Sequence, residues 1–372
     1  MSFTEQCSVK IINKGEKMNS ILHTDEKVIF TIKGRDLNGI LNHPISEAPY
    51  PAIVLLHGSD RSGLNDPYYM EHAERLVQSG FAVLRYEVPS SNESAFETLE
   101  YRTEEAIAAI QYLQSRVDIQ PNAVGLWGIS QGGWICQMAA AAYEGVAFII
   151  PVSGPGVTPV EQEVYRVEAE SRAAGLDQDE IAKAVLMRRA MADIVLAKPI
   201  YREANLSDSQ SLGDGPWRKM VDVVYASSPL DPGAEFEAVM GVLKTIKGES
   251  WTRSLHLDEV LPKLSHVPPQ AWGMVKAQMR AVMEVEPANF LTKVRCPVLV
   301  IFGENDTSVP VEKSVALYKQ YLSEAGNKEV TIKVFPKASH TIRVGEAFAS
   351  GYFELMIDWL QNLQVIKDRI NQ

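Results

Sequence analysis

Residues 123–142 have the sequence AVGLWGISQGGWICQMAAAA, which contains the pattern G-x-S-x-G at residues 128–132. The apolar residues before the pattern are typical of a buried strand, and the small apolar residues after it favour a helix. A sharp strand-to-helix turn strains its central residue, and flanking glycines remove side chains that would clash. The turn therefore predicts that Ser130 is an exposed nucleophile beside the positive end of the helix. The alternative is a glycine-rich turn with an incidental serine, which the strand before it and the helix after it disfavour.

Strand-like apolar runs alternate with helical patterns on both sides of this stretch. The runs are residues 52–56 (AIVLL), 81–87 (FAVLRYE), 146–152 (VAFIIPV), 297–303 (PVLVIFG) and 329–335 (EVTIKVF). This alternation requires a parallel sheet with helices on its faces. Two β-rich segments, residues 28–33 and 37–42, add an antiparallel entry to the sheet. The sequence therefore predicts an α/β fold with a doubly wound, mostly parallel sheet.

The alternation stops after residue 155, where the pattern becomes helical and amphipathic. Thr158 and Glu161 have the spacing of a capping box at the start of a helix. Residues 207–217 (SDSQSLGDGPW) are typical of a surface loop. The predicted organisation is an N-terminal arm at residues 1–26, an α/β core at 27–155 and 291–372, and a helical cap inserted at 156–290.

A serine hydroxyl becomes a good nucleophile only when a base takes its proton, so a histidine is needed. The seven histidines are His23, His43, His57, His72, His256, His266 and His340. His340 follows the last predicted strand, and its loop opens at the same sheet edge as the serine turn. His57 begins a loop better suited to supplying backbone donors, and the other five are predicted to be surface or packing residues. His340 is therefore the predicted base.

The base needs a carboxylate that orients it. Asp306 and Glu304 both follow the strand at residues 297–303. Asp306 is the predicted partner of His340, because its distance from Gly303 gives the loop room to turn toward the histidine. Glu304 is the local alternative.

The oxyanion that forms during acyl transfer needs preorganised backbone N–H donors. The residue after the nucleophile, Gln131, is predicted to supply one of them. The HGSD loop at residues 57–60 is predicted to supply the other, from Ser59. The alternative for this loop is a simple strand-ending turn.

Four tryptophans are candidates for lining a substrate pocket. Trp134 lies four residues after the nucleophile and is predicted to line the acyl site. Trp217, Trp251 and Trp272 lie in the insertion, where packing of a small domain explains them equally well. The insertion follows the strand at residues 146–152, at the sheet edge that carries Ser130. It is therefore predicted to cover a largely apolar pocket above the nucleophile. The alternative is that it forms the interface of a homo-oligomer.

Composition excludes several classes of protein. The chain has 36 Lys and Arg against 47 Asp and Glu, a formal net charge of −11, whereas binding nucleic acid requires a basic surface. Its three cysteines, Cys7, Cys136 and Cys296, are too few for a disulfide framework or a zinc site. No apolar run reaches the length of a membrane span, and the N-terminus lacks the apolar region of a signal peptide. We therefore expect a cytoplasmic protein without metal or cofactor.

Four motifs together resemble the α/β-hydrolase superfamily: HGSDRSG (57–63), GISQGG (128–133), GENDTSVP (303–310) and FPKASH (335–340). The chain is similar to bacterial esterases and dienelactone-hydrolase-like enzymes, and to the catalytic domains of acyl-CoA thioesterases and prolyl-oligopeptidase-like peptidases. The resemblance implies an eight-stranded sheet, a helical cap over the site, and cleavage of an acyl bond without a cofactor. The order serine, aspartate, histidine is the one this family uses. The loop YEVPSS (86–91) departs from the DRxGxGxS pattern of many relatives, which leaves the leaving-group side of the pocket open.

These observations predict a serine hydrolase that cleaves a small-molecule carboxylic ester or lactone by two-step acyl transfer. An acyl-CoA thioesterase or an acyltransferase would use the same three residues. A non-catalytic binding protein built on the same fold is a more remote alternative, because it has no need of all three. The shape of the pocket depends on the insertion, so the sequence does not name the substrate.

Overall fold

The computed structural model describes residues 23–45, 47–59, 63–87, 98–226 and 230–367. The chain forms two compact units. Unit 1 comprises Met1–Gly156, Pro287–Asn305 and Val315–Gln372, and unit 2 comprises Val157–Glu286 and Asp306–Ser314. The sequence does not anticipate that Asp306–Ser314 groups with the inserted segment.

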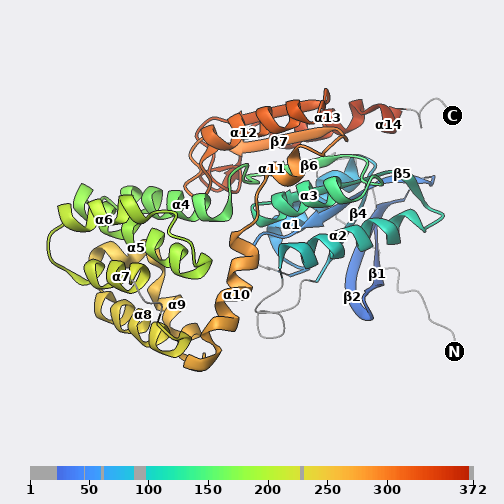
Figure 1. Ribbon diagram of the computed structural model, residues 1–372. Coiled ribbons are helices and arrows are strands. Elements are labelled where there is room, and N and C mark those ends of the chain that lie inside the picture. The colour runs from blue at the N-terminus through green and yellow to red at the C-terminus, as the bar shows by residue number, and fades with distance from the viewer. Residues whose placement is uncertain (1–22, 46, 60–62, 88–97, 227–229, 368–372) are drawn as a thin grey trace. The chain divides into compact units, whose positions relative to one another are not determined.

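Unit 1 is built on a sheet that has eight strands within the described residues, in the order β1-β2-β4-β3-β5-β6-β7-β8 (Figure 1). The strands are β1 (His23–Ile32), β2 (Arg35–Pro44), β3 (Tyr50–Leu56), β4 (Ala82–Tyr86), β5 (Ile119–Ile129), β6 (Ile149–Val152), β7 (Val298–Gly303) and β8 (Val330–Phe335). The pairings of β1 with β2 and of β2 with β4 are antiparallel, and all the others are parallel. The predicted doubly wound, mostly parallel α/β sheet is confirmed. Because parallel strands share one direction, the loops after β3, β5, β6, β7 and β8 all open at one edge.

Helices connect and cover these strands. They are α1 (Pro67–Gln78), α2 (Leu99–Gln114), α3 (Gln131–Ala142), α11 (Ala288–Leu291), α12 (Val311–Glu324), α13 (Tyr352–Asn362) and α14 (Gln364–Lys367), with a small hairpin of β9 (Arg343–Val344) and β10 (Ala347–Phe348). Helix α1 begins at a capping residue, since the Asp66 side chain accepts a hydrogen bond from the Tyr68 N–H and Pro67 occupies the first turn. Gly80 follows the end of the helix with φ +92°.

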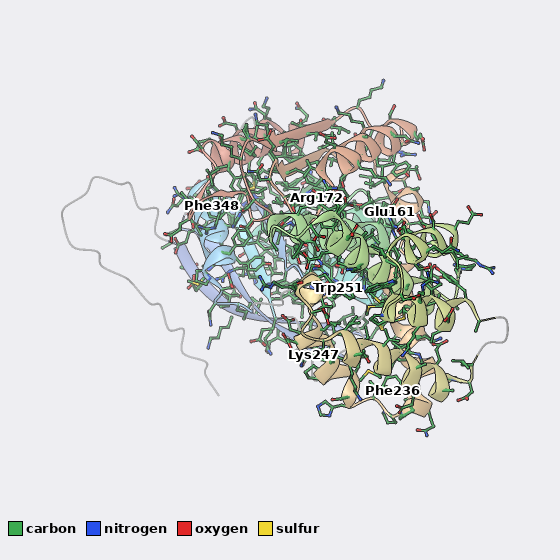
Figure 2. The ribbon with its side chains drawn as sticks, turned by 90° about the vertical axis from the view of Figure 1, so that its left-hand side faces the viewer. Glu161, Arg172, Phe236, Lys247, Trp251 and Phe348 are labelled. Carbon is green, nitrogen blue, oxygen red and sulfur yellow. The ribbon has the colours of Figure 1, made fainter. Side chains whose placement is uncertain are left out.

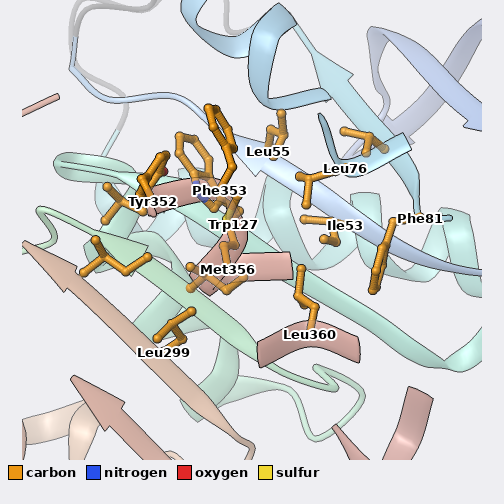
Figure 3. Close-up of a cluster of buried hydrophobic side chains, with 14 of the residues drawn as sticks. Ile53, Leu55, Leu76, Phe81, Trp127, Leu299, Tyr352, Phe353, Met356 and Leu360 are labelled. Atoms are coloured by element: carbon orange, nitrogen blue, oxygen red, sulfur yellow. The ribbon is translucent and has the colours of Figure 1, made fainter. Parts of the chain in front are cut away.

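The main core of unit 1 lies on the face of the sheet covered by α1 and α13 (Figure 3). Ile53 and Leu55 of β3 contribute to it, as do Leu76 of α1 and Met356 and Leu360 of α13. All five are fully buried. On the other face, α2 and α3 pack against β5. Burial on both faces explains why the central strands are continuous apolar runs.

The end predicted for the N-terminal arm of residues 1–26 is wrong, because residue 26 lies inside a strand. Strand β1 already begins at His23 and pairs with β2 from His23 opposite Pro44. Residues 23–27 are polar because β1 is an edge strand, so neither side of this stretch has to be apolar. Residues 1–22 lie outside the described part of the chain.

The regular elements of unit 2 are all helices within its described residues. Its elements are α4 (Pro159–Ala173), α5 (Gln178–Leu196), α6 (Arg202–Ser211), α7 (Pro216–Tyr225), α8 (Pro232–Ile246), η1 (Ser250–Leu255), α9 (Leu257–Ser265), η2 (Pro269–Ala271) and α10 (Trp272–Met283). Thr158 and Glu161 form the predicted capping box. The loop predicted at residues 207–217 is wrong at both ends, because α6 extends to Ser211 and α7 begins at Pro216. Among the described helices, none has the length and apolar character needed to cross a membrane.

Candidate active site

Ser130 occupies the turn between β5 and α3. Its backbone has φ 54° and ψ −117°, and strain of this kind costs about 1–3 kcal/mol. Two hydrogen bonds hold the turn: the Ser130 N–H donates to the Val152 carbonyl (2.9 Å), and the Gly133 N–H donates to the Ser130 carbonyl (2.8 Å). Ser130 therefore has the strained backbone that the G-x-S-x-G pattern predicts.

Two glycines of the pattern are required because other backbone atoms lie against them. A Cβ atom at Gly128 would come within 2.4 Å of the Gly132 carbonyl oxygen. A Cβ atom at Gly132 would come within 2.6 Å of the Leu56 carbonyl oxygen, at the end of β3. The start of α3 is therefore packed directly on the end of β3, and this packing brings Ser130 next to the loop that begins at His57.

The loop after β3 contains one of the predicted oxyanion donors. The Gly58 N–H donates to the hydroxyl of Tyr69 on α1 (3.0 Å), so the Ser59 N–H is the next donor along the loop. Gln131 is the first residue of α3, and an N–H in the first turn of a helix has no acceptor within that helix. The structure places both predicted donors at the ends of the paired strands β3 and β5. Residues 60–62 of this loop lie outside the described residues.

The loop that carries His340 leaves β8 and passes over the end of β7. A Cβ atom at Gly303, the last residue of β7, would lie 2.2 Å from the Ser339 carbonyl oxygen and 2.4 Å from that of Ala338. The Asn305 N–H, just past β7, donates to the Ala338 carbonyl at 2.8 Å. This crossing requires a glycine at position 303, and it carries His340 from β8 past the end of β7.

The crossing ends beside β6. Ser153 directly follows β6, and its hydroxyl donates to the His340 carbonyl at 2.8 Å. Strand β6 pairs with β5, and paired strands lie about 4.8 Å apart. The His340 carbonyl is thus bonded to the residue that follows Val152, and the Val152 carbonyl accepts the hydrogen bond from the Ser130 N–H. The structure brings Ser130 and His340 to one part of the sheet edge, although β6 and β7 separate β5 from β8.

The two candidate carboxylates have different surroundings. Glu304 is exposed, and its Oε2 accepts a hydrogen bond from the Lys337 N–H (2.9 Å). Asp306 is 2% exposed, and its Oδ1 accepts from the N–H groups of Ser308 (2.8 Å) and Val309 (3.0 Å). Glu304 thus fastens the two loops together, whereas Asp306 lies in a buried turn that directly follows Asn305.

Within unit 2, helix α4 holds the segment that contains Asp306. The Tyr165 hydroxyl donates to the Asp306 carbonyl (3.1 Å), and Lys313 Nζ donates to Glu161 Oε1 (2.5 Å). Burial, and next the nearby Asp306, raise the pKa of Tyr165. Glu161 and Arg172 mark the two ends of α4 in Figure 2. Sequence reasoning missed Tyr165, because its only signal is a spacing of four residues from Glu161, which places both on one helix face.

The tryptophans of the insertion lie inside unit 2. Trp217, Trp251 and Trp272 belong to its hydrophobic core, with exposed fractions of 8%, 4% and 3%. Trp251, labelled in Figure 2, contacts Trp217, and their ring centroids are 6.2 Å apart. These positions favour the packing alternative. Trp134 is 4% exposed on α3, one turn after Ser130.

The described residues contain no group of three or more His, Cys, Asp or Glu side chains arranged to hold a metal ion. Cys136 is buried, and burial raises the pKa of its thiol well above the ordinary value, so it behaves as a small apolar residue. Cys296 is only partly buried. Cys7 lies outside the described part of the chain.

Known proteins resemble the chain over much of its length. It is 23% identical over 293 residues to a 31.7 kDa Escherichia coli protein named for the traX-finO intergenic region, covering 77% of this chain and 82% of that protein. It is 31% identical over 129 residues to acyl-coenzyme A thioesterase 1 of Homo sapiens, covering 33% of this chain and 28% of the thioesterase.

Solved structures and a family model agree on the fold. The 2,6-dihydroxy-pseudo-oxynicotine hydrolase has a TM-score of 0.51 at 16% identity, covering 92% of this chain and 69% of that one. A model described as "Alpha/beta hydrolase family" matches residues 53–349, which include the end of β3, the serine turn and the His340 loop. The chain therefore belongs to the alpha/beta hydrolase family.

Proposed function

We propose that the protein is a serine hydrolase that cleaves a carboxylic ester or lactone through Ser130, His340 and Asp306. The observation that carries the proposal is the path of the His340 loop. It crosses Gly303 and is bonded to Ser153, which leads the chain from β8 toward the strands that end next to the strained serine turn. Such a path supports the proposal because general-base catalysis requires the histidine and serine side chains to approach each other.

The chemistry would proceed in two steps. His340 takes the proton of the Ser130 hydroxyl, the serine oxygen attacks the substrate carbonyl carbon, and Asp306 stabilises the imidazolium. The Gln131 and Ser59 N–H groups would stabilise the oxyanion, each lowering the barrier by about 3 kcal/mol. His340 then gives its proton to the leaving alcohol. A water molecule, deprotonated by His340, attacks the acyl-enzyme carbonyl. The bond between the acyl group and the Ser130 oxygen then breaks, His340 returns the proton to that oxygen, and the carboxylic acid leaves.

A thioester is the second candidate substrate, since the chain is 31% identical over 129 residues to an acyl-coenzyme A thioesterase. We favour an uncharged ester because the net charge of −11 disfavours a strongly anionic substrate. An acyltransferase would use the same acyl-enzyme with an acceptor other than water. A binding protein on this fold would have no acyl-enzyme at all.

The test is to measure hydrolysis of p-nitrophenyl esters of several chain lengths, a lactone and an acyl-CoA thioester by the wild type and by Ser130→Ala. We expect activity to fall to the residual level that the oxyanion donors alone provide, and a fluorophosphonate probe to label the wild type but not the variant. His340→Ala should lose as much. Ser211→Ala, an exposed serine on α6, is the matched control and should keep full activity.

The outcomes separate the candidates. A Ser130→Ala variant with wild-type turnover contradicts the proposal, and a wild type without labelling or turnover of any substrate favours the binding protein. A preference for the thioester over the matching oxygen ester moves the assignment to a thioesterase. Greater product formation with an added alcohol than with water identifies an acyltransferase.

A further inference from the structure

Ser153, the first residue after β6, has an unusual combination of properties. It is fully buried, and its backbone has φ +44°, which residues with a side chain rarely adopt. Its N–H donates to the Ile301 carbonyl of β7 (2.7 Å), which extends the pairing between β6 and β7 by one residue. Its hydroxyl donates to the His340 carbonyl (2.8 Å). Ser153 thus links three neighbouring strand ends.

The residues around Ser153 fix it in place. Gln137 of α3 donates from Nε2 to the Pro155 carbonyl (3.2 Å) and is hydrogen-bonded to the Tyr318 hydroxyl. The Tyr318 hydroxyl, on α12, donates to the Gly154 carbonyl (3.1 Å). Gln137 and Tyr318 are completely buried. The side chains of Gln137 and Tyr318 therefore hold the segment 153–155 from two helices. If the segment moved, these buried polar groups would lose their hydrogen-bond partners.

The contact between Gly154 and the nucleophile helix is equally close. A Cβ atom at Gly133, in the first turn of α3, would lie 2.4 Å from the Gly154 Cα atom. The segment that holds the His340 loop thus rests directly on the turn that presents Ser130. Any displacement of this segment would alter the spacing between the two loops.

We propose that Ser153 is a positioning residue for His340, through the bond from its hydroxyl to the His340 carbonyl. This inference rests on the proposed function, because it assigns the bond a consequence for the approach of His340 to Ser130. Two further bonds, Asn305 to Ala338 and Lys337 to Glu304, hold the loop at its beginning. The Ser153 bond is made to His340 itself.

Loss of the Ser153 hydroxyl should therefore leave the loop in place but loosen its tip. A misplacement of 1 Å at a reacting group costs about 100-fold in rate. Since two other bonds remain, we expect kcat for Ser153→Ala to fall by about 10- to 100-fold. KM should stay within about twofold, because Ser153 is buried and does not face the substrate.

The test uses the full-length protein and three variants. Ser153→Ala removes only the hydroxyl, whereas Ser153→Gly removes the hydroxyl and also relieves the positive φ. Ser171→Ala is the matched control, since Ser171 is 1% exposed and its hydroxyl is bonded to that of Ser254 (2.8 Å) within unit 2. The measurements are kcat and KM on the best ester from the panel, the rate of fluorophosphonate labelling, and the thermal midpoint.

If Ser153 acts on His340, Ser153→Ala and Ser153→Gly both lose kcat and label more slowly by a similar factor, while Ser171→Ala keeps wild-type kinetics. Wild-type kcat in a folded Ser153→Ala variant overturns the inference. The inference is also overturned if Ser153→Ala loses kcat while Ser153→Gly keeps the wild-type value. The loss would then come from backbone strain at the positive φ and not from the missing hydroxyl. A loss confined to KM also overturns it.

A failed proposed function has a different signature from a failed inference. If Ser130→Ala keeps full activity, the proposed function is wrong; if Ser130→Ala is inactive and Ser153→Ala is not, only the inference is wrong. Should Ser153→Ala fail to fold, Ser153→Gly tests the same bond, because glycine adopts the positive φ at this position and also lacks the hydroxyl. It should lower kcat by about 10- to 100-fold without changing KM, and an unchanged kcat would contradict the inference.

Discussion

Replacing Gly303 by alanine should separate the proposed base from the proposed nucleophile without touching either. The new Cβ atom would lie 2.2 Å from the Ser339 carbonyl oxygen, and contacts under 3.0 Å are essentially never seen for a Cβ. The loop must therefore move by at least the difference, 0.8 Å. Ser339 is bonded directly to His340, so the imidazole moves by a comparable amount. We expect kcat/KM to fall by about 100-fold.

The assay is ester hydrolysis, with fluorophosphonate labelling as a second measure of Ser130 reactivity. Gly241→Ala is the matched control, because a Cβ atom there meets nothing within 4 Å in the middle of α8. It should keep wild-type activity and gain about 0.5–1 kcal/mol of stability, as expected for glycine to alanine within a helix. A Gly303→Ala variant with wild-type thermal midpoint and wild-type kcat/KM would refute the reasoning, since the crossing would then not set the position of His340.

Two further predictions concern the acid and a buried histidine. Asp306→Asn should lower kcat by about four powers of ten. Glu304→Gln should lower kcat far less, because the Glu304 carboxylate accepts a hydrogen bond from the Lys337 N–H and has no proposed role in catalysis. If Glu304→Gln loses more activity than Asp306→Asn, Glu304 and not Asp306 orients His340. His72 is fully buried, with Nδ1 donating to the Tyr68 carbonyl and Nε2 accepting from the Tyr352 hydroxyl, and burial lowers its pKa to about 3. The unfolded chain binds this proton near pH 6.5, so the free energy of unfolding should fall by about 1.4 kcal/mol per pH unit between pH 6.5 and 3. His72→Gln should remove that part of the slope in denaturant titrations at several pH values, and parallel curves for the two proteins would contradict it.

The sequence predicted the features that depend on local pattern. The serine turn, the strand order along the chain and the capping box of Thr158 and Glu161 follow from glycines, apolar runs and capping residues, and all three are found in the structure. Helix α6 was missed because its sequence is polar and it buries only Asn205 and Ser209. A helix with almost no apolar face has no periodic signal to detect.

The roles of Gly303 and Ser153 could not be predicted from the sequence. Gly303 ends a strand like many other glycines, and its requirement arises only because a loop from β8 passes over it. Ser153 is one of many serines in the chain, and its partner lies 187 residues away. Contacts between distant segments depend on how strands and loops are placed in space, which a single sequence does not encode as a motif.

The grouping of Asp306–Ser314 with α4 bears on how such an insertion could be exchanged between related proteins. Its contiguous part, Val157–Glu286, could be transplanted at two junctions, but the segment held by Tyr165 and Glu161 would stay behind with the recipient. A chimaera built that way would combine a foreign helix with a native acid-bearing loop. Grafting therefore needs two further junctions, so that residues 306–314 are moved together with α4. In natural descent the helix and the loop should have changed in step.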